Sequence, residues 1–276
     1  MEKLLQEIVL SPGNENLFWE CFHENSKVTR YDDALSNEEV LKRMSQLHES
    51  LSFTGYVSVD LPDSLAPLKR PLDEVMTSRA SANNMTACPV TLEQVATLLH
   101  YAYGVTRDNK GTGFPRPLRV VPSGGGLYPL EIFFHTVHVK SLPAGLYHYN
   151  PMKNRLSLVR KGDSTDVIAT AMLQPEIAPN ASLIVFITAI FERSIFKYAD
   201  RGYRYILLEA GHAAQNINLV ANALDFGCRN IGGYFDRDVD HFLDLDGITH
   251  SSIYMMAIGM KDRSVRENET ERIAKA

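Results

Sequence analysis

The sequence predicts an α+β domain in which a mixed sheet packs against one long buried helix. Three observations favour this fold class. Short segments rich in β-branched and aromatic residues recur between residues 132 and 258. One segment, from about Tyr203 to Phe226, places apolar residues at a 3.6-residue period with small residues among them, and Gly227 ends it. Turn signals separate these segments, and the chain has no internal repeat.

Capping signals predict further helices before the long one. Ser36 and Glu39 have the spacing of a capping box and precede apolar residues at helical intervals. Thr91 and Gln94 repeat that spacing, and Gly104 is the expected terminator of their helix. The expected shorter helices cover 17–22, 36–50, 72–78 and 91–104.

The expected strands alternate with these helices in the second part of the chain. A proline-rich segment, LPDSLAPLKRPLD, reads as a linker or an extended arm between two parts of the chain. We therefore expect a helical N-terminal extension, 1–66, ahead of a main domain, 67–276. The expected strands cover 132–139, 145–149, 155–159, 182–190, 227–231 and 252–258.

Composition excludes several classes of protein. The formal net charge is −5 over 276 residues and no block of five like charges occurs, so nucleic-acid and membrane-surface partners are disfavoured. Three scattered cysteines indicate neither a disulfide framework nor a zinc site. The first residues lack signal-peptide features, and the longest apolar run, 183–191, is about half of what spans a bilayer. A cytoplasmic protein is expected.

The first candidate site is a glycine-rich loop, PSGGGLYPLE, that begins at Pro122 and leads into the strand expected from residue 132. Three glycines after Ser123 let backbone N–H groups converge on a flat or anionic ligand without Cβ atoms in the way. The loop lacks the endings of a P-loop and of a dinucleotide fingerprint. The residues alone leave two interpretations open, a ligand cradle or a turn of purely structural use.

The second candidate is the basic segment FKYADRGYR at the start of the long helix. If this segment is helical, Lys197, Arg201 and Arg204 share one face at spacings of four and three residues. A helix N-terminus prefers acidic residues, so such cations are locally unfavourable. They indicate either a solvated helix start or an anion site.

The third candidate is a polar stripe on the long helix. Tyr205, Glu209, His212 and Asn216 follow one another at helical spacing, with Gln215 beside them. Such a stripe is costly unless its groups are satisfied or face a site. Glu209 and His212 have the spacing of a di-iron ligand pair, but no second such pair is visible, so no metal is expected. A hydrogen-bonded structural stripe and a cofactor-pocket lining both remain open.

Two weaker signals complete the set. The segment 77–83, TSRASAN, and the segment 259–263, GMKDR, each carry groups that can bind an anion, although each alone is most often a solvated turn. Cys88 has no histidine or acid at a diagnostic local spacing, which disfavours a nucleophilic role.

Taken in order, the motifs PSGGGLYPLE, FKYxxRGYR and EAGHxxQN resemble the SagB-type branch of the FMN-dependent nitroreductase family. This branch contains the azoline dehydrogenases of thiazole/oxazole-modified peptide biosynthesis. The resemblance covers roughly Pro71 to Arg263, and the helical extension before it is typical of the dehydrogenase subunits of microcin-type synthetases. It implies a nitroreductase-like α+β fold, with a mixed central sheet flanked by helices, assembled as an intertwined homodimer with FMN at the subunit interface.

The resemblance also implies cofactor-binding residues. Two separate cationic segments would converge on the FMN phosphate, and charge-assisted hydrogen bonds are about twice as strong as neutral ones. One position, often Arg in the family, is Asn83 here, which replaces charge by a neutral hydrogen-bonding group. The implied phosphate clamp consists of Arg79, Ser81 and Asn83 together with Lys261 and Arg263. The implied contacts to the ring and ribityl chain are Pro122, Ser123, Gly124, Gly125, Gln215, Asn216, Ile231, Gly232 and Gly233.

Lys197 and Tyr198 match the Lys-Tyr pair regarded as catalytic in this branch. Conversion of a thiazoline or oxazoline to its azole removes a hydride to FMN N5 and a proton from the adjacent carbon, so one of the two could act as the base. The sequence leaves open which of them does so. The implied supporting residues are Arg201, Arg204, Glu209 and His212.

Three functions are therefore compatible with the sequence. The first is oxidation of azolines in a peptide or peptide-like substrate, with O2 reoxidising the flavin and a partner supplying the cyclodehydratase, because the chain shows no ATP site. The second is NAD(P)H-driven reduction of nitro groups, quinones or activated alkenes. The third is a non-catalytic, flavin-free subunit that structures a larger synthetase. The Lys-Tyr pair favours the first.

Overall fold

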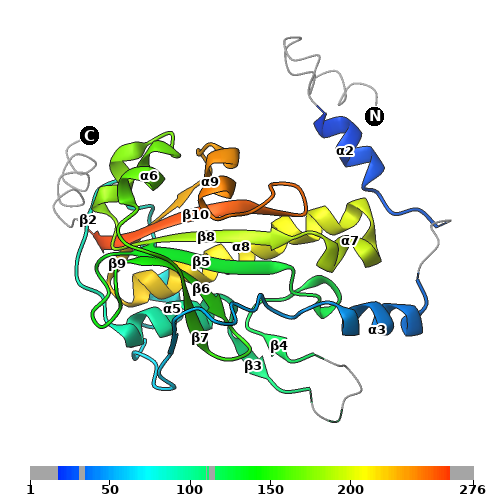
Figure 1. The fold of residues 1–276 in the computed structure, drawn as a ribbon, viewed down its shortest axis with the longest axis horizontal. Helices are drawn as coiled ribbons and strands as arrows, with labels where there is room; N and C mark the ends of the chain where they lie inside the picture. Colours follow the sequence, from blue (N-terminus) through cyan, green and yellow to red (C-terminus); the bar gives the residue numbers. More distant parts are fainter. Residues whose placement is uncertain (1–17, 31–34, 110, 112–115, 262–276) are drawn as a thin grey trace.

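The computed structural model describes residues 18–30, 35–109, 111 and 116–261 and shows an eight-stranded sheet with helices on both faces (Figure 1). The strand order is β1-β7-β6-β5-β8-β10-β2, and β9 also pairs with β10. The two central strands, β5 and β8, are almost entirely buried. The strands are β1 (Ser58–Asp60), β2 (Met85–Thr86), β5 (Leu130–Thr136), β6 (Gly145–Asn150), β7 (Arg155–Lys161), β8 (Leu183–Ile190), β9 (Phe226–Ile231) and β10 (His250–Lys261).

The α+β fold class and the six expected strands are confirmed, and the sheet differs from expectation in one respect. All ladders between its described strands are antiparallel. Parallel pairing among the described residues is confined to the isolated bridges Ser81–Cys228 and Val90–Val139. Two short strands, β3 (Val105–Arg107) and β4 (Leu118–Arg119), form a separate hairpin.

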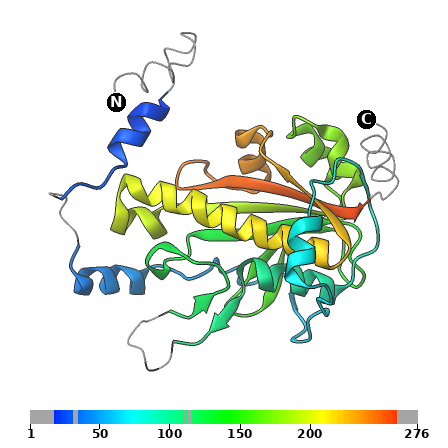
Figure 2. The same cartoon turned by 180° about the vertical axis from the view of Figure 1, so that it is seen from behind.

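The sheet separates two large apolar cores, and helices cover each of them. Helices α5 (Leu92–Tyr103) and α8 (Asp200–Ala223) cover one face of the sheet, and α6 (Thr165–Thr170), η2 (Pro175–Asn180) and α9 (Asp236–Phe242) cover the other (Figures 1 and 2). The remaining elements are α2 (Trp19–Asn25), α3 (Asn37–Gln46), α4 (Leu72–Ser78), η1 (Gly124–Gly126) and α7 (Glu192–Tyr198).

The capping signals act as the sequence predicts. The Ser36 hydroxyl accepts a hydrogen bond from the Glu39 backbone N–H, and Thr91 and Gln94 form a reciprocal capping box. The helix that follows Ser36 ends earlier than expected, at Gln46 rather than near residue 50, because Leu47 adopts an extended conformation. Residues 47–51 instead form a non-helical link, which contacts Arg119 and Glu131 next to the candidate site.

The basic segment 196–204 is not one helix, which corrects the expectation that its cations share a helical face. Helix α7 ends at Tyr198, and α8 begins at Asp200. Between them Ala199 has φ 44 and ψ −138, a conformation that breaks helical geometry. Lys197 therefore lies on a different helix from Arg201 and Arg204.

The N-terminal part contributes to the main sheet as well as extending beyond it. Helix α2 projects from the body of the molecule and buries none of its residues (Figures 1 and 2). By contrast, β1 pairs with β7, and Leu61 is buried in the first core. The division into 1–66 and 67–276 stays a prediction.

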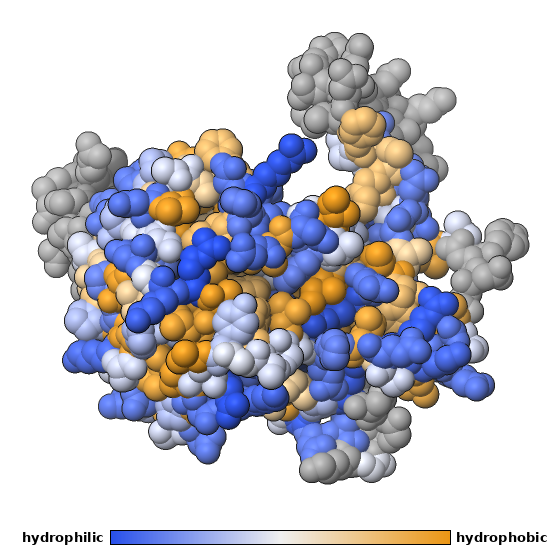
Figure 3. All heavy atoms as spheres, viewed as in Figure 1, coloured by the Kyte–Doolittle hydropathy of each residue, from blue (hydrophilic) through white to orange (hydrophobic). Residues whose placement is uncertain are grey.

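The visible surface is mixed in polarity. Figure 3 shows polar and apolar atoms interspersed over the face seen in Figure 1. None of the helices in the described ranges combines the length and the hydropathy that a membrane span requires.

Candidate functional site

The glycine-rich loop forms a tight turn between β4 and β5. The turn η1, Gly124–Gly126, does not have regular helical geometry: Gly125 and Gly126 have φ of 64 and 65, which glycine tolerates without steric cost. The turn is fixed at its base because the Tyr128 backbone N–H donates to the Ser123 hydroxyl at 2.9 Å. The glycine-rich loop predicted from the sequence therefore has a defined conformation that a hydrogen bond stabilises.

The end of α7 lies directly against this loop. A Cβ atom placed on Gly125 would be 2.7 Å from the Tyr198 hydroxyl and 2.9 Å from Lys197 Nζ. Lys197 Nζ lies 5.2 Å from the centre of the Tyr198 ring, within cation–π range. The structure thus brings together the two residues implied as catalytic and the loop implied as a flavin contact, and any larger residue at Gly125 would displace them.

Helix α3, from the N-terminal part of the chain, packs next to the glycine-rich loop and the end of α7. Val40 and Met44 of α3 form a small buried cluster with Leu127, and the half-buried Tyr198 and Phe196 pack against it. This apolar cover keeps one side of the Tyr198 ring away from water. The sequence did not predict that α3 lies at the site.

Glu209 secures the loop from α8. Its carboxylate accepts a hydrogen bond from the Tyr103 hydroxyl at 2.6 Å and a second one from Ser123. Tyr103 in turn accepts the backbone N–H of Leu130 at 3.1 Å. Burial raises the pKa of Glu209 to about 7, and these two hydroxyls together with the Arg119 guanidinium only partly offset that rise.

Arg119, buried next to this network, stacks on two tyrosine rings. Its guanidinium carbon lies 4.4 Å from the centre of the Tyr103 ring and 4.9 Å from that of Tyr128. It also donates to the Glu49 carbonyl at 2.6 Å, which ties the link after α3 to the loop. The sequence places Glu209 in a polar stripe, but it gives no local signal that Tyr103 and Arg119 lie beside this carboxylate, because they precede Glu209 by 106 and 90 positions.

The remaining cations of the basic segment have different surroundings. Arg204 donates to the Ser26 hydroxyl at 2.7 Å and to the His23 carbonyl, so it is bound to the end of α2. The buried Nε of Arg201 has no hydrogen-bond partner within the described part of the chain. His212 is exposed.

The two halves of the expected phosphate clamp lie side by side at the other end of α8. Ser81 forms a bridge with Cys228, and Lys261 pairs with Met85 at the start of β2. Gly227 permits this approach, because a Cβ atom there would lie 3.3 Å from the Lys261 Cα. Arg79 is half-buried, and Ser81 and Asn83 are exposed. Arg263 lies outside the described residues.

Burial at the clamp has one further effect. It raises the pKa of the Cys228 thiol to about 12, and the nearby Arg79 guanidinium offsets this only in part. The thiol therefore stays protonated near neutral pH, which makes Cys228 a packing residue rather than a nucleophile.

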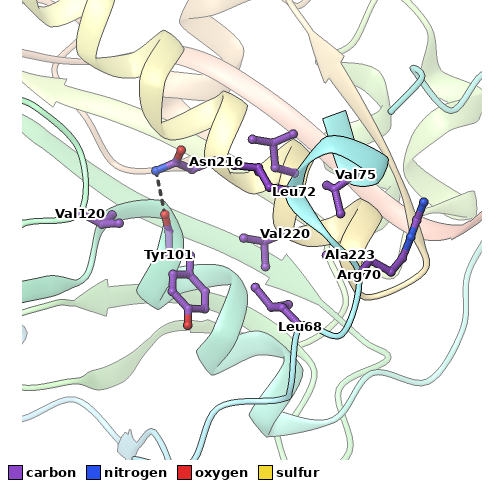
Figure 4. A pocket seen from close by; sticks show the side chains of 10 residues that line it. Leu68, Arg70, Leu72, Val75, Tyr101, Val120, Asn216, Val220 and Ala223 are labelled. Carbon is purple, nitrogen blue, oxygen red and sulfur yellow. Dashed lines mark hydrogen bonds between the residues drawn. The ribbon is translucent and has the colours of Figure 1, made fainter. Parts of the chain in front are cut away.

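The C-terminal part of α8 borders an apolar pocket of about 300 Å³ (Figure 4). Asn216 lies on its wall and donates from Nδ2 to the Tyr101 carbonyl at 2.9 Å. Gln215, the preceding residue of the motif, is exposed. The pocket is lined by Leu68, Arg70, Leu72, Val75, Tyr101, Val120, Asn216, Leu219, Val220 and Ala223.

The segment 231–233 begins at the last residue of β9, and Ile231 packs into the core under α6, η2 and α9 rather than the one under α8. Ile231 is buried and pairs with Met255, whereas a Cβ atom on Gly232 would meet nothing within 4 Å. Asn218, in the C-terminal half of α8, donates at 2.9 Å to the side chain of Asn230, the residue just before this segment. An open glycine backbone of this kind allows a flat ring to approach closely.

Many of the expected catalytic and cofactor-binding residues thus form two groups in one chain. The loop group consists of Ser123, Gly124, Gly125, Lys197 and Tyr198, and the clamp group of Arg79, Ser81 and Lys261. Tyr205, which touches Gly124, and Asn222, which binds Ser78 next to the clamp, are 17 residues apart on α8. At 1.5 Å per residue this is about 25 Å along the helix axis. The loop group and the clamp group therefore cannot contact one small ligand within the same subunit.

A buried ion pair behind the loop was also missed. Arg193 of α7 contacts the Glu131 carboxylate at 2.6 Å, and both side chains are almost completely buried. Glu131 closes the PSGGGLYPLE motif and interrupts an otherwise apolar segment, whereas Arg193 follows Glu192 and precedes Ser194. The lone charge in an apolar segment is the signal that could have identified Glu131, because buried charges are rare unless paired; Arg193 has no such signal.

No group of three or more potential metal ligands occurs among the residues that the structure describes. Glu209 and His212, the spacing pair singled out in the sequence, diverge, because the former is buried and the latter exposed. Glu209 is instead used for hydrogen bonding to the loop.

The chain belongs to the nitroreductase family, whose model matches residues 76–260, and this membership makes it an oxidoreductase. It is 31% identical over 205 residues to MJ1384 of Methanocaldococcus jannaschii, a protein classed with the nitroreductases, covering 74% of this chain and 97% of that one. It is 32% identical over 148 residues to the microcin B17-processing protein McbC of Escherichia coli, covering 51% and 54% of the two chains.

Solved structures support the same fold. A nitroreductase-class protein from Anabaena variabilis matches with a TM-score of 0.65 and 24% identity, covering 85% of this chain and 49% of its own, so the chain spans about half of that protein. The Escherichia coli microcin synthetase McbBCD complex, solved with truncated pro-MccB17 bound, contains a chain that matches with a TM-score of 0.56 and 22% identity, covering 88% and 91%. At these identities the likeness shows the fold alone.

Proposed function

We propose that this protein is an FMN-dependent dehydrogenase that oxidises thiazoline or oxazoline rings of a peptide or peptide-like substrate to the corresponding azoles. The observation that carries the proposal is the meeting of Lys197 Nζ and the Tyr198 hydroxyl at Gly125. Nitroreductases typically bind flavin, and this placement puts two proton-handling groups against the loop expected to touch it. Similarity to McbC supports azoline oxidation rather than another redox reaction.

The residues present suit FMN. Positive-φ glycines at the loop and an open backbone at Gly232 offer surfaces without Cβ atoms, and Arg79 and Lys261 offer positive charge for a phosphate. The Nε of Arg201 is a buried donor that a ligand or a second subunit could satisfy. Bound FMN would supply a hydride acceptor.

The side chains of this protein would handle the accompanying proton. Lys197 Nζ or the Tyr198 hydroxyl would take the proton from the ring carbon of the substrate, and the other would orient the ring by hydrogen bonding. Val40 and Met44 of α3, packed near Tyr198, would exclude water from one side of the reacting atoms. O2 is proposed as the final electron acceptor.

We further propose an intertwined homodimer with FMN at the subunit interface. The ribityl chain of FMN has seven bonds from N10 to phosphorus and reaches no more than about 10 Å at roughly 1.5 Å per bond. The loop group and the clamp group of one chain are too far apart to share it. Two-fold symmetry would let the loop of one subunit meet the clamp of the other, giving two equal sites.

Mixing two inactive variants tests this arrangement. Lys197→Ala removes the loop group's base, and the double variant Arg79→Ala/Lys261→Ala weakens the clamp. After subunit exchange, half of the dimers contain one intact site, so about a quarter of the wild-type activity should return. No recovery, despite exchange shown by native mass spectrometry, would mean that both groups act within one subunit.

The surroundings of this activity are proposed from the same similarities. Residues 1–66 would form a helical extension of a flavin domain covering 67–276. A partner would supply the cyclodehydratase that forms the azoline, as the match to the McbBCD complex suggests, and the protein would act in the cytoplasm.

The decisive experiment has two readouts. The visible spectrum of the purified chain shows whether flavin is bound, and mass spectrometry of an azoline peptide should show a loss of about 2 Da per ring, equal to one hydride and one proton. Rapid bleaching of the flavin by NADPH without any mass loss would favour a nitro, quinone or alkene reductase. The similarity to MJ1384 over 205 residues supports this alternative. A chain without affinity for FMN would favour a scaffold subunit.

A further inference from the structure

The Glu131 carboxylate is a junction of four parts of the chain. Oε1 contacts Arg193 of α7 at 2.6 Å and accepts the Leu51 backbone N–H at 3.0 Å. Oε2 accepts the Ser50 hydroxyl at 3.2 Å and contacts His148 Nε2 of β6 at 2.6 Å. Because a carboxylate only accepts, His148 Nε2 must carry the proton in this contact.

These partners keep Glu131 ionised inside the protein. Burial opposes ionisation, but the Arg193 guanidinium and the hydrogen bond from His148 outweigh it and lower the pKa of Glu131 to about 2. The ion pair is therefore present over the whole physiological pH range. A charge held so firmly in a closed interior fixes the relative positions of the elements that supply its partners.

The two elements joined by this pair are the same two that meet at the candidate site. Glu131 lies on β5, six residues after Gly125, and Arg193 lies on α7, four residues before Lys197. Residues four apart share one face of a helix. The buried pair and the contact of Lys197 and Tyr198 with Gly125 are thus two connections between one loop-strand unit and one helix.

Helix α7 cannot set its own orientation. It has only seven residues and no side-chain cap at its N-terminus, and helices of this length are marginal without tertiary contacts. Its C-terminal end is followed by the non-helical Ala199, so α8 does not continue it. Arg193, which is 2% exposed, is its main charged anchor.

We propose that Glu131 and Arg193 are positioning residues that set where Lys197 and Tyr198 stand relative to the Gly124–Gly126 loop. The inference rests on the proposed function for its rate prediction, but its structural part does not. Ser50 and Leu51 bind the same carboxylate, so the pair also sets the link that carries α3 onto Tyr198.

The test must separate positioning from stability. Removal of one partner leaves an unpaired buried charge and is strongly destabilising, whereas replacement of both by groups of similar volume is often tolerated. The variant to make is therefore Glu131→Gln with Arg193→Met. The matched control is Asp60→Asn with Arg155→Met, which removes an exposed ion pair between β1 and β7.

Steady-state kinetics, FMN content, a crystal structure and thermal unfolding are measured on the flavin-loaded, full-length protein. We expect kcat for azoline oxidation to fall by roughly 100-fold with KM and FMN content nearly unchanged, because a displacement of about 1 Å can have this effect. The crystal structure of the double variant should show the Lys197 end of α7 displaced from Gly125. The control variant should match the wild type in both respects, and thermal unfolding should confirm that both variants are folded.

The outcomes distinguish the two proposals. An unchanged kcat and an unmoved α7 would overturn the positioning role. If the wild-type protein does not oxidise azolines, the proposed function fails, and the crystal structure of the double variant still decides: a displaced α7 supports positioning, and an unmoved one rejects it. A variant that does not fold is replaced by Glu131→Gln with Arg193→Gln, to which the same criteria apply.

Discussion

The two ends of α8 differ in how complete they are. Near its start, Lys197 and Tyr198 lie against Gly125, and α3 packs near Tyr198. Glu209 holds the same loop through Ser123 and Tyr103. At its last turns, the clamp segments lie side by side, but Ser81 and Asn83 face solvent. The first region is preorganised by contacts within the chain.

This difference suggests a division of labour between the two regions. Groups that handle protons must be held in fixed geometry, because small displacements lower reaction rates strongly. Groups that bind a phosphate can remain exposed until the ligand arrives, since charge-assisted hydrogen bonds supply the affinity. Each of the following predictions tests whether one region can be changed without the other.

The largest effect is expected from Lys197→Ala. If Lys197 Nζ handles the proton, azoline turnover should fall by roughly 10²- to 10⁴-fold while FMN binding is retained. The measurement is single-turnover oxidation followed by mass spectrometry, with the exposed Lys140→Ala as the control. Turnover at the wild-type rate would remove Lys197 from the mechanism, and Tyr198→Phe would then test the neighbouring hydroxyl.

The next effect concerns stability at the Glu209 network. The pKa of Glu209 is raised from 4.5 to about 7, so the folded state holds this proton more tightly than the unfolded state. Its contribution to stability is complete below pH 4.5 and is lost as the pH rises through about 7, a change of about 3 kcal/mol. Glu209→Gln cannot titrate, so the wild type should lose stability relative to this variant over that range.

Urea unfolding between about pH 4 and pH 8 measures this difference. His250, whose pKa is lowered to about 4 chiefly by burial, has the opposite pH dependence, but it is present in both proteins and cancels. Glu93→Gln, an exposed substitution on α5, is the matched control. If the difference in unfolding free energy between Glu209→Gln and the wild type does not change with pH, the pKa of Glu209 is not raised by folding.

A smaller effect is expected at the clamp. Arg79→Ala should weaken FMN binding by roughly 10- to 100-fold, because a hydrogen bond to a charged group contributes about 1.5–3 kcal/mol. Riboflavin, which lacks the phosphate, should bind the variant and the wild type equally in fluorescence titrations. Equal loss for both ligands would show that Arg79 supports the fold or the ring rather than the phosphate, and Arg237→Ala on α9 is the matched control.

The smallest effect is expected at the break between α7 and α8. Ala199 has φ 44, where a Cβ atom is unfavourable, so Ala199→Gly should stabilise the protein by about 1 kcal/mol. Thermal unfolding measures this change. A lower Tm would mean that glycine's added freedom in the unfolded chain outweighs the relieved strain.

The sequence predicted the main elements because their signals are local. The 3.6-residue period of α8, the capping box at Thr91 and the six β-rich segments depend only on neighbouring residues. The short strands β1 and β2 carry too few residues for a period to show. The break at Ala199 was missed because alanine favours helix, and only tertiary contacts impose a positive φ there.

The candidate site was predicted in part for the same reason. The glycine loop and the Lys197-Tyr198 pair were visible as motifs, and the structure brings them together. The supports of that site, Glu131 with Arg193 and Glu209 with Tyr103, connect residues 62 and 106 positions apart. Pairing over such distances follows from the sheet register and helix packing, which no local pattern encodes.

The pairing of β1 with β7 bears on how this chain can be shortened. A fragment beginning at residue 67 would lack β1 and Leu61 and would leave the backbone groups of β7 open along one side. Open strand edges recruit other chains, so such a fragment should aggregate. The helices α2 and α3 precede this strand, and a fragment that starts between residues 51 and 57 keeps β7 paired with β1.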